Sequence, residues 1–380
     1  MKELAIFGST GSIGCSTLNV VRRERERFSV SILAAGHNRE RLIQQIQEFS
    51  PRHVYIIEEK NAAILHECFP GLDIYWGRDG IEQISRLCDF DIGVSALVGV
   101  AGLRPTWNMI QNGKTVALAN KEVLVAGGRL VMEAARARHA ALLTVDSEHS
   151  AIMQCLRGEH HAEIERILLT ASGGPFFEKE ITDAITPQEA LQHPTWKMGP
   201  KITIDSATMM NKGFEVIEAR WLFDVPVEKV QVVIHRQSIV HSMVEFQDGS
   251  IMANIAPPDM EIPIAYALSY PERMASPHHL DIFAMKALEF KAPDYDKFPC
   301  LRLAIAAAKG GHSAQVVLNA ANEVLVADFL AGGIRFTDIP RGVETMLEQH
   351  TTQDLGSIDA VLTLDEEIRK KTEEWIKMRR

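Results

Sequence analysis

The amino-acid sequence predicts an α/β protein with a Rossmann-like, doubly wound sheet at its N-terminus, a central α+β domain and a helical C-terminal domain. Three observations support this prediction. Short apolar runs alternate with helical patterns through about residue 150, a mixed strand and helix pattern follows, and Ala-rich helical periodicity dominates from Leu301 onward.

The N-terminal region contains short apolar runs of the kind that form buried parallel strands, because such strands are covered on both faces. These runs are Leu4–Phe7, Val30–Ala34, Val54–Ile57, Ile92–Val94, Val116–Ala119 and Leu142–Val145. Their alternation with helical segments predicts the doubly wound sheet.

The central region has a different order of predicted strands and helices. It shows a strand at Ile167–Thr170, a helix near Asn211–Phe223 and strands within Val230–Ile255. The Asp248-Gly249 pair predicts a hairpin turn between two of these strands.

Prolines between Pro257 and Pro271, and the irregular stretch that follows, are expected to interrupt regular structure. We therefore expect domains at 1–150 and 151–270, a linker at 271–296 and a helical domain at 297–380.

Bulk composition excludes several functional classes. The 380 residues carry a net charge of -10, so the protein lacks the positive potential that favours binding to nucleic acid or to an anionic membrane. Five dispersed cysteines without a CxxC pair indicate neither a disulfide framework nor a thiolate metal site. The strand-like start of the chain leaves no room for a targeting peptide, and no apolar run approaches bilayer length. We expect a soluble, cytoplasmic protein.

A glycine-rich segment, Gly8–Gly14, follows the first predicted strand and opens a helix. Glycines at this place let the backbone approach a pyrophosphate, although such a pattern can also be only a tight turn. The second strand ends in Ala34–Asn38 without the carboxylate that NAD sites usually place there, which favours NADP. Arg39 and His37 could meet the 2'-phosphate or simply cap or solvate the next helix.

Acidic residues follow another predicted strand. Asp146 and Glu148, two residues apart, can project the same way from extended backbone, and carboxylate oxygens suit Mg²⁺ or Mn²⁺. A third acid is needed, and Glu215 is a candidate that could equally be an exposed helix acid. Lys121 follows a neighbouring strand and could meet substrate oxygens, or pair with Glu122 at a helix start.

Irregular segments in the central region predict a mobile lid. Ser172–Pro175 is rich in backbone donors, and His193–Gly199 mixes an aromatic ring, a histidine and a thioether. The alternative is that Trp196 and Met198 are ordinary packing residues. From sequence alone, His149, His235 and His241 are structural rather than catalytic.

Several ordered motifs together resemble the 1-deoxy-D-xylulose 5-phosphate reductoisomerase family. The motifs are GSTGSIG (8–14), LANKE (118–122), VDSEH (145–149), ASGGPF (171–176), HPTWKMG (193–199) and DSATMMNKG (205–213). The resemblance continues through IHRQSIVHSMVEFQDGS (234–250), APDYDKFPCLRLA (292–304) and LNAANEVLVADFL (318–330), so it covers nearly the whole chain.

The resemblance implies roles for residues that spacing alone leaves open. It implies metal ligands at Asp146, Glu148 and Glu215, which with Lys121 form the implied catalytic set. It implies substrate contacts from Lys121, Ser147, Glu148, Ser172, His193, Trp196, Met198, Ser206, Asn211, Lys212 and Glu215. It implies NADPH contacts from Thr10, Gly11, Ser12, Ile13, Gly36, His37, Asn38, Asn120, Glu122 and Gly199. Trp196 and Met198 would then belong to a flap at about 186–200 rather than to ordinary packing.

The family reaction is the NADPH-dependent rearrangement and reduction of 1-deoxy-D-xylulose 5-phosphate to 2-C-methyl-D-erythritol 4-phosphate, a step of non-mevalonate isoprenoid biosynthesis. The resemblance therefore implies an NADP-dependent oxidoreductase with Mg²⁺ or Mn²⁺, a small phosphorylated sugar as substrate and a homodimer. Two other hypotheses remain: an NADP-sensing protein without chemistry, and an ordinary dehydrogenase of a phosphorylated hydroxy compound.

Overall fold

The computed structural model describes residues 1–285 and 287–379, which form two compact units. Unit 1 contains Met1–Val123, Val131–Ser150 and Asp259–Pro277. Unit 2 contains Leu124–Leu130, Ala151–Pro258 and the described residues from His278 onward. Residues 286 and 380, which fall in the predicted linker and C-terminal domain, lie outside the described residues.

Unit 1 is built on a seven-stranded sheet in which every pairing is parallel. The strands are β1 (Lys2–Phe7), β2 (Phe28–Ala35), β3 (His53–Ile56), β4 (Asp73–Trp76), β5 (Ile92–Ser95), β6 (Thr115–Leu118) and β7 (Leu142–Thr144). Their order is β4-β3-β2-β1-β5-β6-β7, which confirms the predicted doubly wound sheet. The order reverses between β1 and β5, where ligands bind in such sheets.

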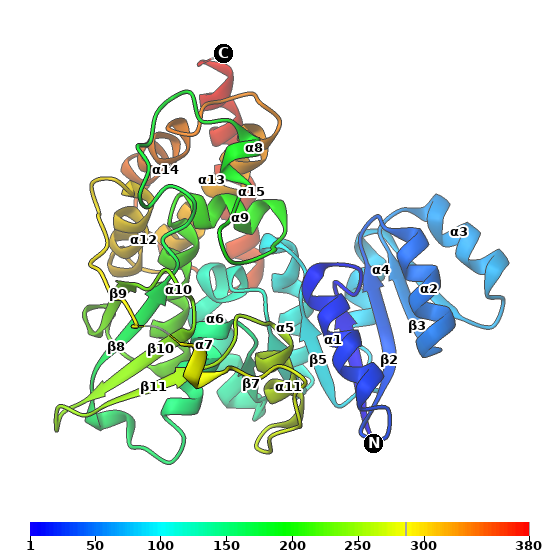
Figure 1. Cartoon of the computed structure of the whole chain (residues 1–380). Coiled ribbons are helices and arrows are strands. Elements are labelled where there is room, and N and C mark those ends of the chain that lie inside the picture. Colours follow the sequence, from blue (N-terminus) through cyan, green and yellow to red (C-terminus); the bar gives the residue numbers. More distant parts are fainter. Residues whose placement is uncertain (286, 380) are drawn as a thin grey trace. The chain divides into compact units, whose positions relative to one another are not determined.

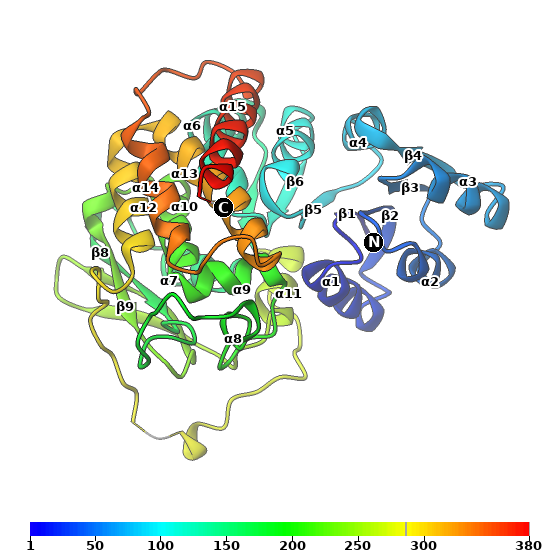
Figure 2. The same ribbon diagram turned by 90° about the horizontal axis from the view of Figure 1, so that it is seen from above.

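Helices cover both faces of this sheet, with α1 and α2 on one face and α4 and α5 on the other (Figure 2). The helices of unit 1 are α1 (Ser12–Arg23), α2 (Arg39–Phe49), α3 (Glu59–Cys68), α4 (Gly77–Ser85), α5 (Leu103–Gln111) and α11 (Glu261–Ser269), with a 3-10 turn at Gly99–Gly102. Two further helices, α6 (Glu122–Arg138) and α7 (Ser147–Cys155), are shared between the units: α6 begins and ends in unit 1 with Leu124–Leu130 in unit 2, and α7 begins in unit 1 and ends in unit 2.

Two features of unit 1 differ from the sequence expectation. Strand β4 has no counterpart among the predicted strands, because it lies at the sheet edge and presents the exposed Asp73 and Trp76 rather than an apolar run. The expectation that Pro257–Pro271 interrupts regular structure is wrong for α11, which packs against α1. Pro263 lies in the first turn of α11, where a missing N–H costs the helix no internal hydrogen bond.

Unit 2 contains a four-stranded sheet in the order β11-β10-β8-β9 (Figure 1). The strands are β8 (Ile164–Ala171), β9 (Val230–Ile234), β10 (Val240–Phe246) and β11 (Ile251–Ile255). The predicted hairpin joins β10 to β11: Asp248 Oδ1 accepts the N–H of Ser250 at 2.8 Å, and Gly249 takes a φ of +83°. Strands β8 and β9 run parallel with Ala171 opposite Ile234, so the segments that follow them begin at one edge.

The helices of unit 2 confirm the helical C-terminal region. They are α8 (Pro187–Ala190), α9 (Pro200–Ala207), α10 (Met210–Phe223), α12 (Pro299–Gly310), α13 (His312–Leu330), α14 (Asp338–Glu348) and α15 (Ile358–Lys377), with 3-10 turns at His161–Glu163, Val227–Lys229 and Ile282–Ala284. Helix α13 is buried along most of its length and packs against α12, α14 and α15 (Figure 2). None of the five cysteines is in a disulfide, as predicted. In the described ranges, no helix is long and apolar enough to cross a bilayer.

Candidate active site

The glycine-rich segment lies at the carboxyl end of β1, where the strand order reverses. Gly8 has a φ of +99°, and a Cβ there would lie 2.3 Å from the carbonyl oxygen of Ala96, just beyond β5. A Cβ on Gly14 would lie 2.3 Å from the carbonyl oxygen of Gly8. Thr10, Gly11, Ser12 and Ile13 are exposed or half-buried at the N-terminus of α1. This is a backbone cradle with open donors, suited to a pyrophosphate.

The second predicted cofactor segment, Gly36–Asn38, follows β2 and neighbours this cradle. His37 Nδ1 lies 2.9 Å from Glu58 Oε1, and the Asn38 side chain caps α2 by accepting the N–H of Arg41. The guanidinium of Arg41 donates to the carbonyl of Thr10 at 3.1 Å, which ties the two segments together. The guanidinium of Arg39 donates to Glu40 Oε1 at 2.8 Å and to Asn61 Oδ1 of α3 at 3.2 Å.

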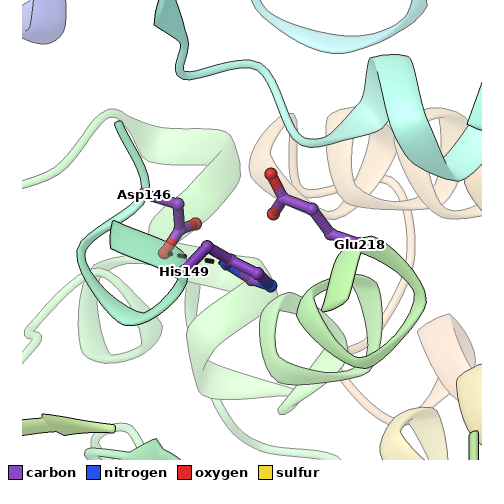
Figure 3. A group of neighbouring side chains, drawn as sticks. All are labelled: Asp146, His149 and Glu218. Carbon is purple, nitrogen blue, oxygen red and sulfur yellow. Dashed lines mark ion pairs between the residues drawn. The ribbon is translucent and has the colours of Figure 1, made fainter. Parts of the chain in front are cut away.

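Unit 1 also holds the predicted acidic residues at the carboxyl end of β7. Asp146 is buried; its Oδ2 lies 2.5 Å from Lys121 Nζ and its Oδ1 lies 3.6 Å from His149 Nδ1 (Figure 3). The hydroxyl of Ser147 donates to Glu148 Oε2 at 2.6 Å. The structure therefore gathers a lysine, two carboxylates and a histidine, as expected for side chains that follow the adjacent strands β6 and β7. Figure 3 also labels Glu218, which projects from α10 in unit 2.

Two predicted cofactor residues flank Lys121. The Asn120 amide donates to the carbonyl of Gly99 at 2.9 Å and is almost fully buried. A Cβ on Gly102 would lie 2.1 Å from that amide nitrogen, so the 3-10 turn at Gly99–Gly102 fits around it. Glu122 is buried in the first turn of α6, where a negative charge suits the helix dipole.

Unit 2 places a second acid beside a second lysine, on α10. Glu215 is 1% exposed; Asn211 donates to its Oε1 at 2.6 Å, and Lys212 is ion-paired with its Oε2. The sequence left open whether Glu215 is an exposed helix acid, and the structure shows that it is buried. A buried carboxylate is retained where a cation or hydrogen-bond donors stabilise its charge.

The loop after β8 contains Ser172, Gly173 and Gly174. Both glycines have positive φ, and a Cβ on Gly174 would lie 2.5 Å from the carbonyl oxygen of Ser206 in α9. The loop therefore packs directly on the segment that carries Ser206, another predicted substrate residue. Glycine is required at both positions because L side chains rarely adopt this backbone conformation.

His193 connects the flap to this loop through both ring nitrogens. Its Nδ1 accepts the backbone N–H groups of Thr195 at 3.2 Å and Trp196 at 2.9 Å, so the proton of the neutral ring is on Nε2. Nε2 then donates to Ser172 Oγ at 2.9 Å, and the N–H of Gly174 donates to the same oxygen at 3.2 Å. Burial, and secondly Arg236, lower the pKa of His193 from 6.5 to about 4, which keeps the ring neutral.

The other flap residues that are predicted to contact ligands, Trp196, Met198 and Gly199, are half-buried or exposed. The ring of Trp196 lies 6.2 Å from the ring of His241, and Met198 is half-buried. Gly199 precedes Pro200, which starts α9 at a position where proline is favoured. His241 and His235 bond backbone carbonyls, of Ala256 and Glu289 respectively, in agreement with a structural role.

Comparison with known proteins assigns the chain to a family. Models of the 1-deoxy-D-xylulose 5-phosphate reductoisomerase match residues 4–128, and models of its C-terminal domains match residues 142–223 and 255–371. The chain belongs to the 1-deoxy-D-xylulose 5-phosphate reductoisomerase family. Curated reductoisomerases are similar end to end: that of Prosthecochloris aestuarii is 51% identical, over 96% of this chain and 97% of its own, and that of Geotalea uraniireducens is 49% identical, over 99% of each.

Solved structures of reductoisomerases have the same fold. A DOX-P reductoisomerase in complex with NADPH, fosmidomycin and magnesium is 42% identical, with a TM-score of 0.96 over 100% of this chain and 99% of its own. The reductoisomerase of Zymomonas mobilis in complex with NADPH is 40% identical, with a TM-score of 0.92 over 99% of each chain. These comparisons confirm both the fold class and the family that the motifs indicated.

Two residues of the chain contact predicted site residues, although the sequence pattern does not mark them as functional. His149 Nδ1 lies 3.6 Å from Asp146 Oδ1, and their spacing of three residues at a helix start, which puts both on one face, is the signal that could have indicated it. Arg236 bonds the carbonyls of Ser172 and Gly174. Arg236 lies just after β9, and Ser172 lies just after β8. Because these two strands pair in parallel, both residues lie at the same edge of the sheet, which the sequence alone does not reveal.

Proposed function

We propose that the chain catalyses the NADPH-dependent rearrangement and reduction of 1-deoxy-D-xylulose 5-phosphate to 2-C-methyl-D-erythritol 4-phosphate, with a divalent metal that chelates the substrate. The observation that carries this function is the end-to-end similarity to reductoisomerases, one of which was solved with NADPH, fosmidomycin and magnesium. In the reaction one carbon–carbon bond breaks and another forms, giving a branched aldehyde, which a hydride and a proton then reduce to the alcohol.

The cradle at Gly8–Gly14 fits a dinucleotide. Both end glycines approach backbone so closely that a side chain would collide, while the N-terminus of α1 stays open to an anion. Among the predicted cofactor residues after β2, Gly36, His37 and Asn38 bring no carboxylate, and the nearby Glu58 is already paired with His37 and Lys60. A 2'-phosphate therefore meets no uncompensated negative charge, which supports NADPH. When bound, NADPH supplies the hydride.

Asp146, Glu148 and Glu215 are the proposed metal ligands. All three are carboxylates, which suit Mg²⁺ or Mn²⁺ better than softer metals. Two of the three carboxylates are each paired with a buried lysine: Asp146 with Lys121 in unit 1, and Glu215 with Lys212 in unit 2. A divalent metal would take over this neutralisation, and both ammonium groups could then turn to substrate oxygens. When bound, the metal supplies Lewis-acid stabilisation of negative charge on the reacting oxygens.

The proposed substrate contacts divide by task. Ser172, Ser206, Asn211 and Lys212 bind the phosphate, and binding energy gathered there helps to close the flap and exclude water. Trp196 and Met198 cover the carbon chain, and His193 links this flap to Ser172. Lys121, Ser147 and Glu148 lie at the reacting carbons, where the ammonium of Lys121 stabilises a developing alkoxide or moves a proton. Asn120, Glu122 and Gly199 complete the NADPH contacts.

We also propose the finer organisation that the sequence suggested. The region 1–150 binds NADPH, 151–270 carries catalytic residues and the flap at about 186–200, 271–296 links, and 297–380 is the helical domain. The acidic composition and the dispersed, unpaired cysteines support a cytoplasmic enzyme, and the predominance of two-fold oligomers supports a homodimer.

Product identification tests the reaction itself. The protein should be incubated with 13C-labelled 1-deoxy-D-xylulose 5-phosphate, NADPH and Mg²⁺, and the product read by 13C NMR. We expect the branched methylerythritol phosphate skeleton. An unbranched reduction product would indicate an ordinary dehydrogenase, and tight NADPH binding without any product would indicate the sensor alternative.

A further inference from the structure

Arg236 clamps the loop that follows β8. One guanidinium nitrogen, Nη1, donates to the carbonyl of Ser172 at 3.0 Å and to the carbonyl of Gly174 at 2.7 Å. The guanidinium also lies 5.8 Å from the ring centre of Phe177. That ring packs on Gly173, because a Cβ there would approach it to 2.9 Å. Arg236 therefore contacts both ends of the Ser172–Gly174 turn and the ring beneath it.

The turn needs such a clamp because its backbone is permissive. Gly173 and Gly174 have φ of +76° and +66°, and consecutive glycines leave the unbound loop many alternative conformations. The Arg236 guanidinium donates to the carbonyls of both Ser172 and Gly174, and this shared donor favours one conformation of the loop. Hydrogen bonds to charged groups are stronger than neutral ones, so the selection is effective even for a half-buried side chain.

In this conformation the Ser172 hydroxyl still has its own hydrogen to donate. Ser172 Oγ accepts from His193 Nε2 and from the N–H of Gly174, which uses both of its lone pairs. Within the described part of the chain its own hydrogen has no recorded acceptor, so this O–H can donate to an anionic ligand. The arrangement requires a neutral His193, and the charged group that acts on this ring is Arg236.

We propose that Arg236 is a positioning residue for the substrate phosphate: by bonding the carbonyls of Ser172 and Gly174 it aims the Ser172 hydroxyl at the phosphate and keeps His193 in the tautomer that joins loop to flap. The proposal rests on the proposed function only for the identity of the ligand. It assigns to unit 2 a determinant of phosphate affinity that does not itself touch the substrate.

The test uses the full-length protein with Arg236→Met, which removes the charge and both hydrogen bonds at similar length, and Arg236→Lys, which keeps the charge. Arg236→Met should raise KM for 1-deoxy-D-xylulose 5-phosphate and Ki for inorganic phosphate by about tenfold. This is the effect expected when the single hydrogen bond from the Ser172 hydroxyl to the charged phosphate is lost. KM for NADPH should not move. The pKa of His193, followed by histidine NMR with His193→Gln for assignment, should rise in Arg236→Met and stay low in Arg236→Lys.

Arg166→Met is the matched control, since this exposed arginine near the start of β8 pairs with Glu245 and Gln231 instead of the loop. Wild-type values for phosphate affinity, or an unmoved His193 titration, in folded Arg236→Met would overturn the proposal. If that variant does not fold, Arg236→Gln decides, because it also removes the charge, and wild-type phosphate affinity with an unmoved His193 titration there would overturn the proposal. Failure of the wild type to turn over substrate would overturn the proposed function alone, because inorganic phosphate binding and the His193 titration still test Arg236.

Discussion

Lys121 Nζ lies 2.5 Å from Asp146 Oδ2, and both side chains are buried. The pair joins residues that follow two adjacent parallel strands, β6 and β7. In a buried ion pair the loss of one partner leaves the other charge without compensation, which costs about 3–5 kcal/mol. In the proposed metal site, a divalent cation would replace the ammonium group as the partner of this carboxylate.

Asp146→Asn should abolish turnover while NADPH binding persists. The change removes a proposed metal ligand and the Asp146 partner of the Lys121 ammonium, so we expect turnover to fall by at least about a hundredfold. The free energy of unfolding in urea should fall by about 3 kcal/mol. Glu67→Gln, on the exposed surface of α3, is the control and should change neither quantity. Turnover near the wild-type rate in Asp146→Asn would contradict the metal assignment.

Gly14→Ala should impair NADPH binding. The added methyl group would lie 2.3 Å from the carbonyl of Gly8 and 2.5 Å from Cα of Ser9, so the cradle must shift at a cost of about 1–3 kcal/mol. Fluorescence titration with NADPH measures the loss. Gly71→Ala, where nothing lies within 4 Å, should bind as the wild type does. Equal affinities for the two variants would show that the cofactor binds elsewhere.

Gly174→Ala should raise KM for the phosphorylated substrate without changing KM for NADPH. The change strains a residue at φ +66° and pushes a methyl group to 2.5 Å from the carbonyl of Ser206. Gly158→Ala, at φ +89° with nothing within 4 Å, has the same backbone strain without the collision. Steady-state kinetics of the two variants therefore separate strain from damage to the phosphate loop, and the account fails if they behave alike.

Stability should fall as pH decreases from 6.5 toward about 4, partly because of His193. Burial and Arg236 lower its pKa from 6.5 to about 4 in the folded protein, so the unfolded chain binds more protons in this window. His193→Gln should reduce the slope of unfolding free energy against pH, as measured by urea melts. His160→Gln, an exposed residue without a side-chain cap bond, is the control. A slope identical to the wild type would exclude a buried neutral His193.

Local sequence signals were sufficient for the parallel sheet of unit 1. Buried strands such as Leu4–Phe7 within β1 are continuous apolar runs, and helices separate them. The edge strand β4 was missed because Trp76 is 41% exposed and Asp73 is polar, so no apolar run marks it. The sequence pattern does not reveal α11, because proline breaks most helices, although it is tolerated in the first turn, where Pro263 lies.

The site was predicted unevenly, for a physical reason. Residues that directly follow strands, such as Asp146 and Ser172, could be recognised from pattern and motif. The burial of Glu215 could not, because it depends on how α10 packs against α12, which one helix pattern does not encode. The contacts of Arg236 depend on the register of β8 against β9 in the same way.

The central claim, a metal-dependent oxidation of NADPH by the phosphorylated substrate, is tested most directly by following NADPH absorbance with chelator-treated protein. The protein is mixed with NADPH and 1-deoxy-D-xylulose 5-phosphate, and Mg²⁺ or Mn²⁺ is then added to the same sample. Absorbance should stay constant until the metal is added and then fall until one reactant is exhausted. Metal-independent oxidation, or no oxidation after the metal is restored, would contradict the account.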